Sequence, residues 1–183
     1  GAEVIVADGG SADGTAQVAA PLADRVLAGA RGRAAQMNAG ASRAGGDTLL
    51  FLHADTRLPE DADRLVLDGL AASGREWGRF DVAIEGRSPL LRVVASCMNA
   101  RSRLTAIATG DQAIFVRRAA FEAAGGFPPI ALMEDIALSK ALKRRGPPLC
   151  LRRRAITSGR RWERHGTLAT VLLMWRLRLA YFL

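Results

Sequence analysis

The sequence predicts a single α/β domain whose doubly wound, mostly parallel sheet is flanked by helices. Two observations support this fold class. Runs of large apolar residues at positions 4–7 and 48–52 show no polar alternation, which is typical of strands buried on both faces of a sheet. Helical patterns lie between and after these runs, so strands and helices alternate along the chain. At 183 residues the chain can bury one core without disulfides or metals.

The first half of the chain follows a β-α-β-α-β order. After the strand at residues 4–7 we expect a helix at 15–20, a short strand at 25–28, a helix at 33–43 and the strand at 48–52. Pro59, Glu60 and Asp61 then predict the first turn of a helix that continues to about residue 73. Proline suits the first helical position, and acidic side chains are stabilised at the positive N-terminal end of a helix.

The second half adds elements of both kinds. We expect a strand at residues 77–84, a helix at 89–105, a strand at 113–116, and helices at 118–124 and 135–145. The three arginines at 152–154 indicate a basic surface loop. The apolar stretch 167–183 contains Arg176 and Arg178, so it predicts a docking or interfacial helix and not a membrane span, with packing on the sheet as the alternative.

The charge of the chain fits an anionic partner. Lys and Arg number 26 against 18 Asp and Glu, and the net charge of +8 suits phosphorylated metabolites, a lipid surface or nucleic acid. Aromatic residues make up only 5% and are not interleaved with the basic clusters, so we expect no nucleic-acid partner.

The two cysteines bear on the cellular compartment. Cys97 and Cys150 lie far apart in the sequence, which excludes a disulfide framework and a thiolate zinc site. We expect both thiols to be buried as small apolar groups. This predicts a protein of the cytoplasm, with peripheral contact at the inner face of the membrane through the C-terminal helix.

Both clear strands end in carboxylates, and open α/β sheets bind ligands at the carboxyl ends of their strands. Asp8 ends the first strand and is followed by a turn with Gly9, Ser11 and Asp13. The glycines of this turn would expose backbone N–H groups to a nucleoside. In the alternative, Ser11 or Asp13 only caps the next helix.

His53 and Asp55 follow the second strand. Mn²⁺ or Mg²⁺ bridging two phosphates needs only one or two protein ligands, and an imidazole beside a carboxylate fits Mn²⁺ better than Ca²⁺. A solvated loop is the alternative for this short motif.

Two further polar segments follow. Glu134 and Asp135 precede a helix, where one carboxylate is placed to act as a general base, or where Asp135 serves only as the helix N-cap. Gly110, Asp111 and Gln112 enter a strand and offer polar groups for a hydroxyl-rich ligand, or form an ordinary turn.

Arginines occur again near the C-terminus, around a tryptophan. Arg160 and Arg161 offer guanidinium groups for a diphosphate, and the indole of Trp162 offers a flat face for a sugar or base. A basic surface loop is the alternative.

Taken in order over residues 4–162, these segments resemble the inverting family 2 glycosyltransferases, which have the GT-A fold. Residues 4–15 are similar to the family's second strand and its D-G-S-x-D-G-T turn, and residues 32–40 to its G-x-x-x-A-x-N-x-G helix. Residues 52–55 correspond to its L-D-A-D metal motif, with His53 in place of the first acid. The T-G-D-Q segment at 109–112, the G-G-F at 125–127 and the E-D pair at 134–135 resemble acceptor-side and catalytic segments.

The resemblance implies a role for each matching residue. Asp8 would contact the nucleotide with Arg33 nearby, Asp55 would be a metal ligand, and Asp135 would be the catalytic base. Residues 160–162 resemble the end of the Q-x-x-R-W motif of processive members, but Ser158 replaces the glutamine, so chain elongation is not implied.

The implied activity is transfer of a sugar from a nucleoside diphosphate-sugar to an acceptor hydroxyl, with a lipid-linked acceptor as one candidate. Because the family normally begins with one more strand and helix, the resemblance also implies a chain truncated at its N-terminus. The alternative is a module that keeps the fold and binds nucleotides or anions without turnover.

Overall fold

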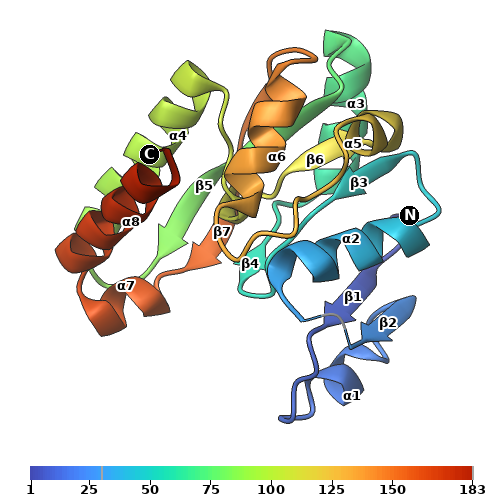
Figure 1. Ribbon diagram of the computed structural model, residues 1–183, viewed down its shortest axis with the longest axis horizontal. Helices are drawn as coiled ribbons and strands as arrows, with labels where there is room; N and C mark the ends of the chain where they lie inside the picture. Colours follow the sequence, from blue (N-terminus) through green and yellow to red (C-terminus); the bar gives the residue numbers. More distant parts are fainter. Residues whose placement is uncertain (30, 183) are drawn as a thin grey trace.

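The computed structural model describes residues 1–29 and 31–182 and shows a layered α/β arrangement (Figure 1). The elements follow one another as β1 (Ile5–Asp8), α1 (Thr15–Ala19), β2 (Arg25–Ala28), α2 (Arg33–Arg43), β3 (Thr48–Leu50), β4 (Thr56–Arg57), α3 (Ala62–Ser73), β5 (Trp77–Glu85), α4 (Leu90–Thr105), the 3-10 turn Gly110–Gln112, β6 (Phe115–Arg117), α5 (Arg118–Ala123), α6 (Glu134–Lys143), β7 (Leu149–Ser158), α7 (Arg160–His165) and α8 (Thr167–Phe182). The alternation expected for the first half is therefore present.

The strands form two sheets of mixed direction. β1 and β2 pair in parallel, while five strands form a second sheet in the order β3-β6-β5-β7-β4. In this larger sheet only the β5–β7 pair is parallel, so the expectation of a mostly parallel sheet is corrected to a mixed one within the α/β class. An apolar run records burial on both faces of a strand but not its direction, which is why the sequence did not reveal the antiparallel strands.

Helices cover both faces of the larger sheet. One face packs against α2, α5 and α6 in a cluster that includes Leu49, Trp77 and Leu138. The other face packs against α3, with Phe80, Phe115 and other residues at its centre. These two apolar layers hold the strand ends that carry the polar segments.

β7 was not expected as a strand. The predicted loop at 152–154 lies inside it: Leu151 pairs with Phe80 and Arg154 with Asp81, so two arginines of β7 are left unpaired in a bulge. The bulge breaks the alternation of apolar and polar residues, which hid the strand in the sequence. β7 continues to Ser158 and pairs with β4, and this brings the end of the chain against the segment that follows β3.

Two helix starts differ from expectation because the preceding residue has a left-handed backbone. Asp61 has φ 55°, so α3 begins at Ala62 and not at Pro59. Met133 has φ 68°, so α6 begins at Glu134, and Asp135 lies in its first turn and is not the N-cap. The carboxylate of Asp135 is thereby free to face another part of the chain.

The cysteines and the last helix complete the comparison with the sequence. Cys97 is exposed and Cys150 is half-buried, so the expectation that both are buried was wrong: Cys97 lies on the outer side of α4. α8 covers most of the predicted C-terminal helix, and Leu183 lies outside the described residues. Within residues 1–29 and 31–182, no helix combines the length and apolar character needed to cross a bilayer.

Candidate active site

The turn after β1 is organised by the side chain of Asp8. Its Oδ2 accepts hydrogen bonds from the N–H groups of Gly10 (3.1 Å) and Ser11 (2.9 Å), and its Oδ1 accepts one from Ser11 Oγ at 2.6 Å. These hydrogen bonds, led by the Ser11 hydroxyl, hold the pKa of the Asp8 carboxyl below its usual range. Asp8 is therefore an ionised group that shapes its own turn.

The rest of this turn uses a second carboxylate in the same way. Asp13 Oδ1 accepts hydrogen bonds from Thr15 Oγ1 (2.5 Å) and Thr15 N (3.1 Å), and these lower its pKa. Gly10 and Gly14, at φ 87° and 80°, adopt the left-handed backbone that glycine tolerates. Gly9 and Ser11 lie in the same turn, so the predicted nucleotide segment is one ordered loop.

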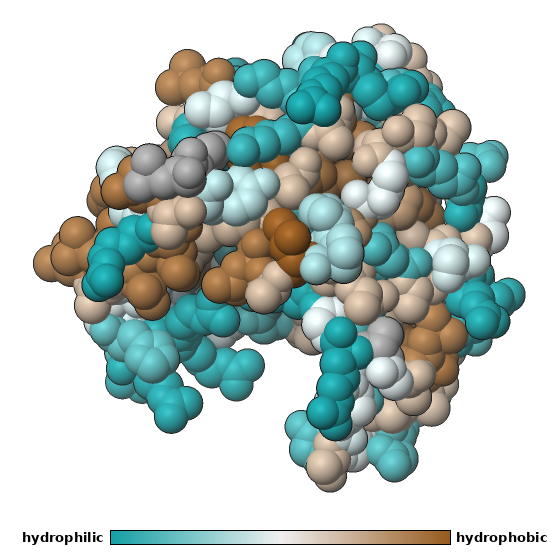
Figure 2. Space-filling model, viewed as in Figure 1, coloured by the Kyte–Doolittle hydropathy of each residue, from teal (hydrophilic) through white to brown (hydrophobic). Residues whose placement is uncertain are grey.

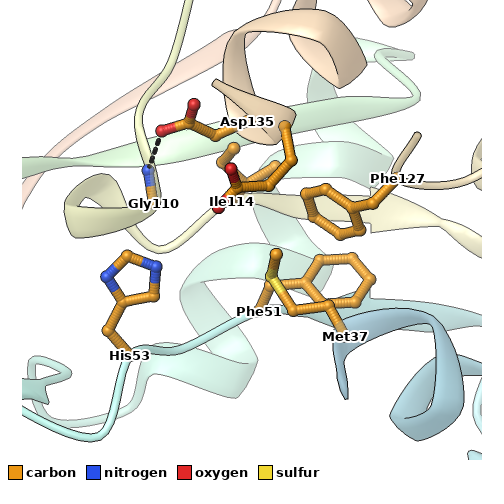
Figure 3. A pocket seen from close by; sticks show the side chains of 8 residues that line it. Met37, Phe51, His53, Gly110, Ile114, Phe127 and Asp135 are labelled. Atoms are coloured by element: carbon orange, nitrogen blue, oxygen red, sulfur yellow. Dashed lines mark hydrogen bonds between the residues drawn. The ribbon is translucent and has the colours of Figure 1, made fainter. Parts of the chain in front are cut away.

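A second group of predicted residues lines a small pocket at the edge of the larger sheet (Figure 3). The lining residues are Met37, Phe51, His53, Gly110, Ile114, Phe127, Glu134 and Asp135. They come from α2, the segment after β3, the 3-10 turn, the residues around β6, and α6. The tertiary fold therefore assembles motifs that lie about a hundred residues apart in the sequence.

Asp135 holds the upper wall of this pocket in Figure 3, with Gly110 between it and His53. Its Oδ2 accepts a hydrogen bond from Gly110 N at 2.9 Å, and its Oδ1 accepts one from Ile136 N at 2.7 Å. Burial raises the pKa of the Asp135 carboxyl, while the Gly110 N–H group opposes this shift. The result is a positioned carboxylate with more proton affinity than an ordinary aspartate.

Glu134 is buried at 3% exposure and meets the arginine predicted to lie near the nucleotide. Its Oε1 is 3.6 Å from Nε of Arg33, whose side chain is about half exposed. A buried carboxylate needs a partner, and Arg33 supplies the positive charge from the first residue of α2. The remaining exposed part of Arg33 faces outward, where it is available to an anionic ligand.

His53 lies across the pocket and contacts the 3-10 turn. Its Nδ1 is 3.4 Å from Oδ1 of Asp111, and this contact raises the pKa of the imidazole, against the opposing effect of burial. The absence of a side chain at Gly110 is required here, because a Cβ would collide with the His53 ring. The glycine of the T-G-D-Q segment therefore serves close packing against the predicted metal residue.

The second predicted metal ligand, Asp55, is exposed at a turn beside His53. The turn is closed by a hydrogen bond from Thr56 N to His53 O (3.0 Å), and Ser158 N donates to Asp55 O (3.1 Å). Among the described residues the Asp55 carboxylate makes no hydrogen bond or ion pair, so both of its oxygens remain available.

These residues fit a divalent metal that shares its coordination with a ligand. His53, Asp55 and Asp111 supply one imidazole and two carboxylates, a donor set that Mn²⁺ accepts. In the part of the chain that the structure describes, no three such side chains are already gathered closely enough to hold an ion by themselves. Phosphate oxygens and water would have to complete the site.

Gln112 supports the pocket from behind and is fully buried. Its Oε1 accepts a hydrogen bond from Thr109 N (3.2 Å), and its Nε2 donates to Asn99 Oδ1 (3.3 Å) on α4. Asn99 also bonds the N–H and C=O groups of Val82 in β5. Gln112 thus links the turn that carries Gly110 and Asp111 to α4 and, through Asn99, to the centre of the sheet.

The arginines and tryptophan near the C-terminus lie in α7 and not in a loop. Arg160 and Arg161 are exposed, whereas the Trp162 indole packs against the cluster of β5 and α4 that includes Leu91 and Ala95. Trp162 therefore lies away from the pocket around Asp135. The β4–β7 pairing nevertheless places the start of α7 close to the turn that carries Asp55.

Asn38 of α2 was quoted in the helix motif but not expected to act at the site. Its Nδ2 donates to Phe127 O (2.8 Å) and its Oδ1 accepts from Phe127 N (3.0 Å). A Cβ at Gly126 would lie 2.9 Å from this Oδ1, so glycine is needed there. The spacing of the α2 motif was the only sequence signal that singled out Asn38. Periodicity cannot indicate a contact between residues that lie 89 positions apart.

The three groups of predicted residues lie around one hollow of the surface. Figure 2 shows this hollow between β1, α1 and β2 on one side and α7 on the other, with β4 above it. The turn after β1 belongs to the first side and α7 to the second. Elements that carry predicted residues therefore border this hollow, and His53, Gly110, Glu134 and Asp135 line the pocket described above.

Comparison with known proteins identifies the class of this chain. Residues 1–120 match the family described as Glycosyl transferase family 2, so the chain belongs to this family. No curated protein matches the chain by sequence. The match spans the Asp8 turn, the α2 motif, the His53–Asp55 segment and the T-G-D-Q turn.

Solved structures of similar fold are glycosyltransferases with the GT-A fold. S. aureus TarS (residues 1-349) shares 16% identity with a TM-score of 0.60, covering 84% of this chain and 48% of its own. A mannosyltransferase from Pyrobaculum calidifontis, solved with GDP-Man and Mn²⁺, shares 22% identity with a TM-score of 0.59, covering 84% and 47%.

A mannosyl-3-phosphoglycerate synthase from Rubrobacter xylanophilus shares 18% identity with a TM-score of 0.54, covering 99% of this chain and 65% of its own. The chain thus spans about half the length of the first two structures, and these likenesses describe the fold.

Proposed function

We propose that this chain transfers a hexosyl group from a nucleoside diphosphate-sugar to an acceptor hydroxyl with inversion at the anomeric carbon. The observation that carries this proposal is the carboxylate of Asp135, which is held in the pocket wall by Gly110 N and has a raised pKa. A general base must lie within reach of the proton that it removes and must bind that proton well enough to take it.

Asp135 acts as this base. It accepts the proton of the acceptor hydroxyl while the hydroxyl oxygen attacks the anomeric carbon from the side opposite the leaving diphosphate. One in-line displacement inverts the configuration. The Gly110 N–H group holds Oδ2 of this carboxylate, and the N–H group of Ile136 in the first turn of α6 orients Oδ1.

Positive charge around the hollow supports donor binding. Arg33 lies beside the pocket, and the exposed Arg160 and Arg161 stand on the α7 side, where guanidinium groups bind diphosphate oxygens. The nucleoside occupies the Asp8 turn, and the sugar lies over Gly110 and Asp111. Gln112, being buried, contributes by holding these two residues in place.

His53 and Asp55, with Asp111 beside them, would hold a divalent metal. Such an ion neutralises negative charge on a leaving diphosphate. The fold packs the His53 imidazole against Gly110 and leaves the Asp55 carboxylate without a partner among the described residues, so that it is available when the donor binds.

Replacement of the base tests the proposal. Asp135→Asn should lower the release of nucleoside diphosphate from UDP- or GDP-hexoses by roughly 10²- to 10⁴-fold, which is the usual contribution of a general base. Calorimetry with UDP or GDP and Mn²⁺ should give nearly unchanged affinity. Asp68→Asn, an exposed carboxylate on α3, is the matched control and should change neither quantity.

Two results would contradict the proposal. Wild-type turnover by Asp135→Asn would remove this residue as the base. Nucleotide binding by the wild-type chain without donor cleavage or transfer would favour a binding module that keeps the fold. NMR of the glycosidic product tests inversion, since retention would exclude a single displacement.

A further inference from the structure

α8 turns its apolar side outward. The helix spans Thr167–Phe182, and large apolar side chains are exposed along its outer side: Leu168, Leu172, Leu173, Trp175 and Leu179. Trp175 is 74% exposed. A surface helix of a globular protein normally shows a polar outer face, whereas α8 is apolar on its outer side as well as on its inner side. Figure 2 shows apolar surface at the end of the molecule where α8 lies.

Packing of the opposite side fixes this orientation. Thr170 is buried, and Val171, Met174 and Leu177 are half-buried on the inner side of the helix. Nζ of Lys140 in α6 lies 4.6 Å from the centre of the Tyr181 ring. Rotation of α8 to hide its exposed leucines would break these contacts, so the apolar side is available only to something outside the described chain.

Two exposed arginines, called here the basic rim, accompany the apolar side. Arg176 of α8 is exposed among the outer leucines, four positions after Leu172 and three before Leu179, and Arg164 is exposed on the neighbouring helix α7. Glu163 is the single acidic residue between positions 160 and 182, and its Oε1 already accepts a hydrogen bond from Arg87 N at 2.6 Å. Two arginines against this one carboxylate leave the rim with a net positive charge.

We propose that the outer side of α8, with this basic rim, docks onto an anionic lipid bilayer. Exposed leucines and a tryptophan with an arginine among them and another on the adjacent helix match the headgroup boundary, where apolar side chains enter the acyl region and guanidinium groups bind lipid phosphates. The charge of the rim argues against a second copy of this chain as the occupant, because a twofold interface would place arginines against arginines.

Docking would bring the candidate active site to the lipid surface. α7 begins two residues after Ser158, whose N–H group donates to Asp55 O, so α8 is joined to the metal turn by a short ordered segment. The docking inference does not depend on the proposed transfer activity, since vesicle binding is measured without any donor or acceptor.

Co-sedimentation of the whole chain with vesicles tests the proposal. We expect binding to phosphatidylcholine vesicles that contain phosphatidylglycerol, and at least tenfold weaker partition to pure phosphatidylcholine, because each basic residue near an anionic surface adds attraction. Replacing three outer apolar residues should weaken partition to the anionic vesicles by at least tenfold through lost burial. That variant carries Leu172→Gln, Trp175→Gln and Leu179→Gln.

A matched variant replaces three exposed apolar residues elsewhere and should bind vesicles like the wild type. It carries Val18→Gln, Leu22→Gln and Leu67→Gln. Far-ultraviolet circular dichroism shows whether either variant is folded, and Arg164→Gln with Arg176→Gln is a second test that leaves the apolar side intact and should reduce the anionic preference.

Three outcomes would overturn the proposal: no vesicle binding by the wild type, equal loss in both triple variants, or a wild-type dimer in sedimentation velocity that only the α8 variant dissociates.

Discussion

The turn after β1 and the pocket at the start of α6 each depend on an aspartate, but the two carboxylates have opposite electrostatic surroundings. Asp8 accepts three hydrogen bonds from its own turn, and its pKa is lowered. Asp135 is half-buried among residues from distant segments, whose desolvation of the carboxyl raises its pKa. The turn after β1 therefore stabilises the ionised Asp8 carboxylate, whose hydrogen bonds hold the turn in place. The pocket at α6 instead destabilises the ionised Asp135 carboxylate, which raises its affinity for a proton.

The difference also separates binding from chemistry. An ionised carboxylate with a lowered pKa accepts hydrogen bonds well but takes protons poorly, so the Asp8 turn suits a binding role. A carboxylate with a raised pKa takes a proton more readily at neutral pH, so the α6 pocket suits a base.

The largest expected effect is a kinetic separation of the two regions. Asp135→Asn should lower kcat by roughly 10²- to 10⁴-fold with little change in nucleotide affinity. Asp8→Asn should instead weaken nucleotide binding, because loss of the charge loosens the hydrogen bonds to Ser11 and with them the turn. Steady-state kinetics and calorimetry on both variants measure this. If Asp8→Asn lowered kcat and left nucleotide affinity unchanged, the assignment of the Asp8 turn to binding and of the Asp135 pocket to catalysis would be wrong.

The buried support of the pocket provides a second, smaller test. Gln112→Leu leaves the buried N–H group of Thr109 without its partner and removes one of the two hydrogen bonds to Asn99 Oδ1, which keeps the bond from Val82 N. A buried polar group left unpaired costs about 1–3 kcal/mol. We expect a lower free energy of unfolding in urea together with a lower kcat. Gln17→Leu is the control and should change neither, because Gln17 is exposed on the short helix α1 and its side chain makes no hydrogen bond among the described residues.

The smallest expected effect concerns thermal stability: replacing Asp135 and replacing Asp8 by asparagine should shift Tm at neutral pH in opposite directions. The pKa of Asp135 is higher in the folded chain than in the unfolded chain. The protonated carboxyl therefore contributes to the free energy of unfolding below the unfolded pKa, and this contribution is lost as the pH rises through the folded pKa. Asp135→Asn should therefore raise Tm at about pH 7, and the gain should vanish in acid.

Asp8 should behave in the opposite way. The pKa of Asp8 is lower in the folded chain than in the unfolded chain. Its ionised carboxylate therefore stabilises the fold above the unfolded pKa, and this stabilisation is lost as the pH falls through the folded pKa. Asp8→Asn should accordingly lower Tm at about pH 7. Thermal melts over a pH series measure both variants. Shifts of the same sign in the two variants would contradict the opposite surroundings described for the two carboxylates.

Local chemistry made much of this molecule predictable. The apolar runs placed β1 and β3, helical spacing placed α2, α4 and α6, and the order of short motifs indicated the family, all of which depend on residues close together in the chain. The turn after β1 was equally accessible, because Asp8 bonds residues only two and three positions away.

Contacts between distant residues were decided only by the tertiary structure. The bulge that hides β7, the antiparallel direction of β6 and the burial of Gln112 all depend on partners far along the chain. The same holds for Asp135, which the sequence offered as either cap or base: its raised pKa results from burial, and burial exists only once α6 packs against the Gly110 turn. Sequence patterns determined which groups are available, whereas desolvation and long-range hydrogen bonds, which exist only in the folded chain, determined how the two aspartates differ.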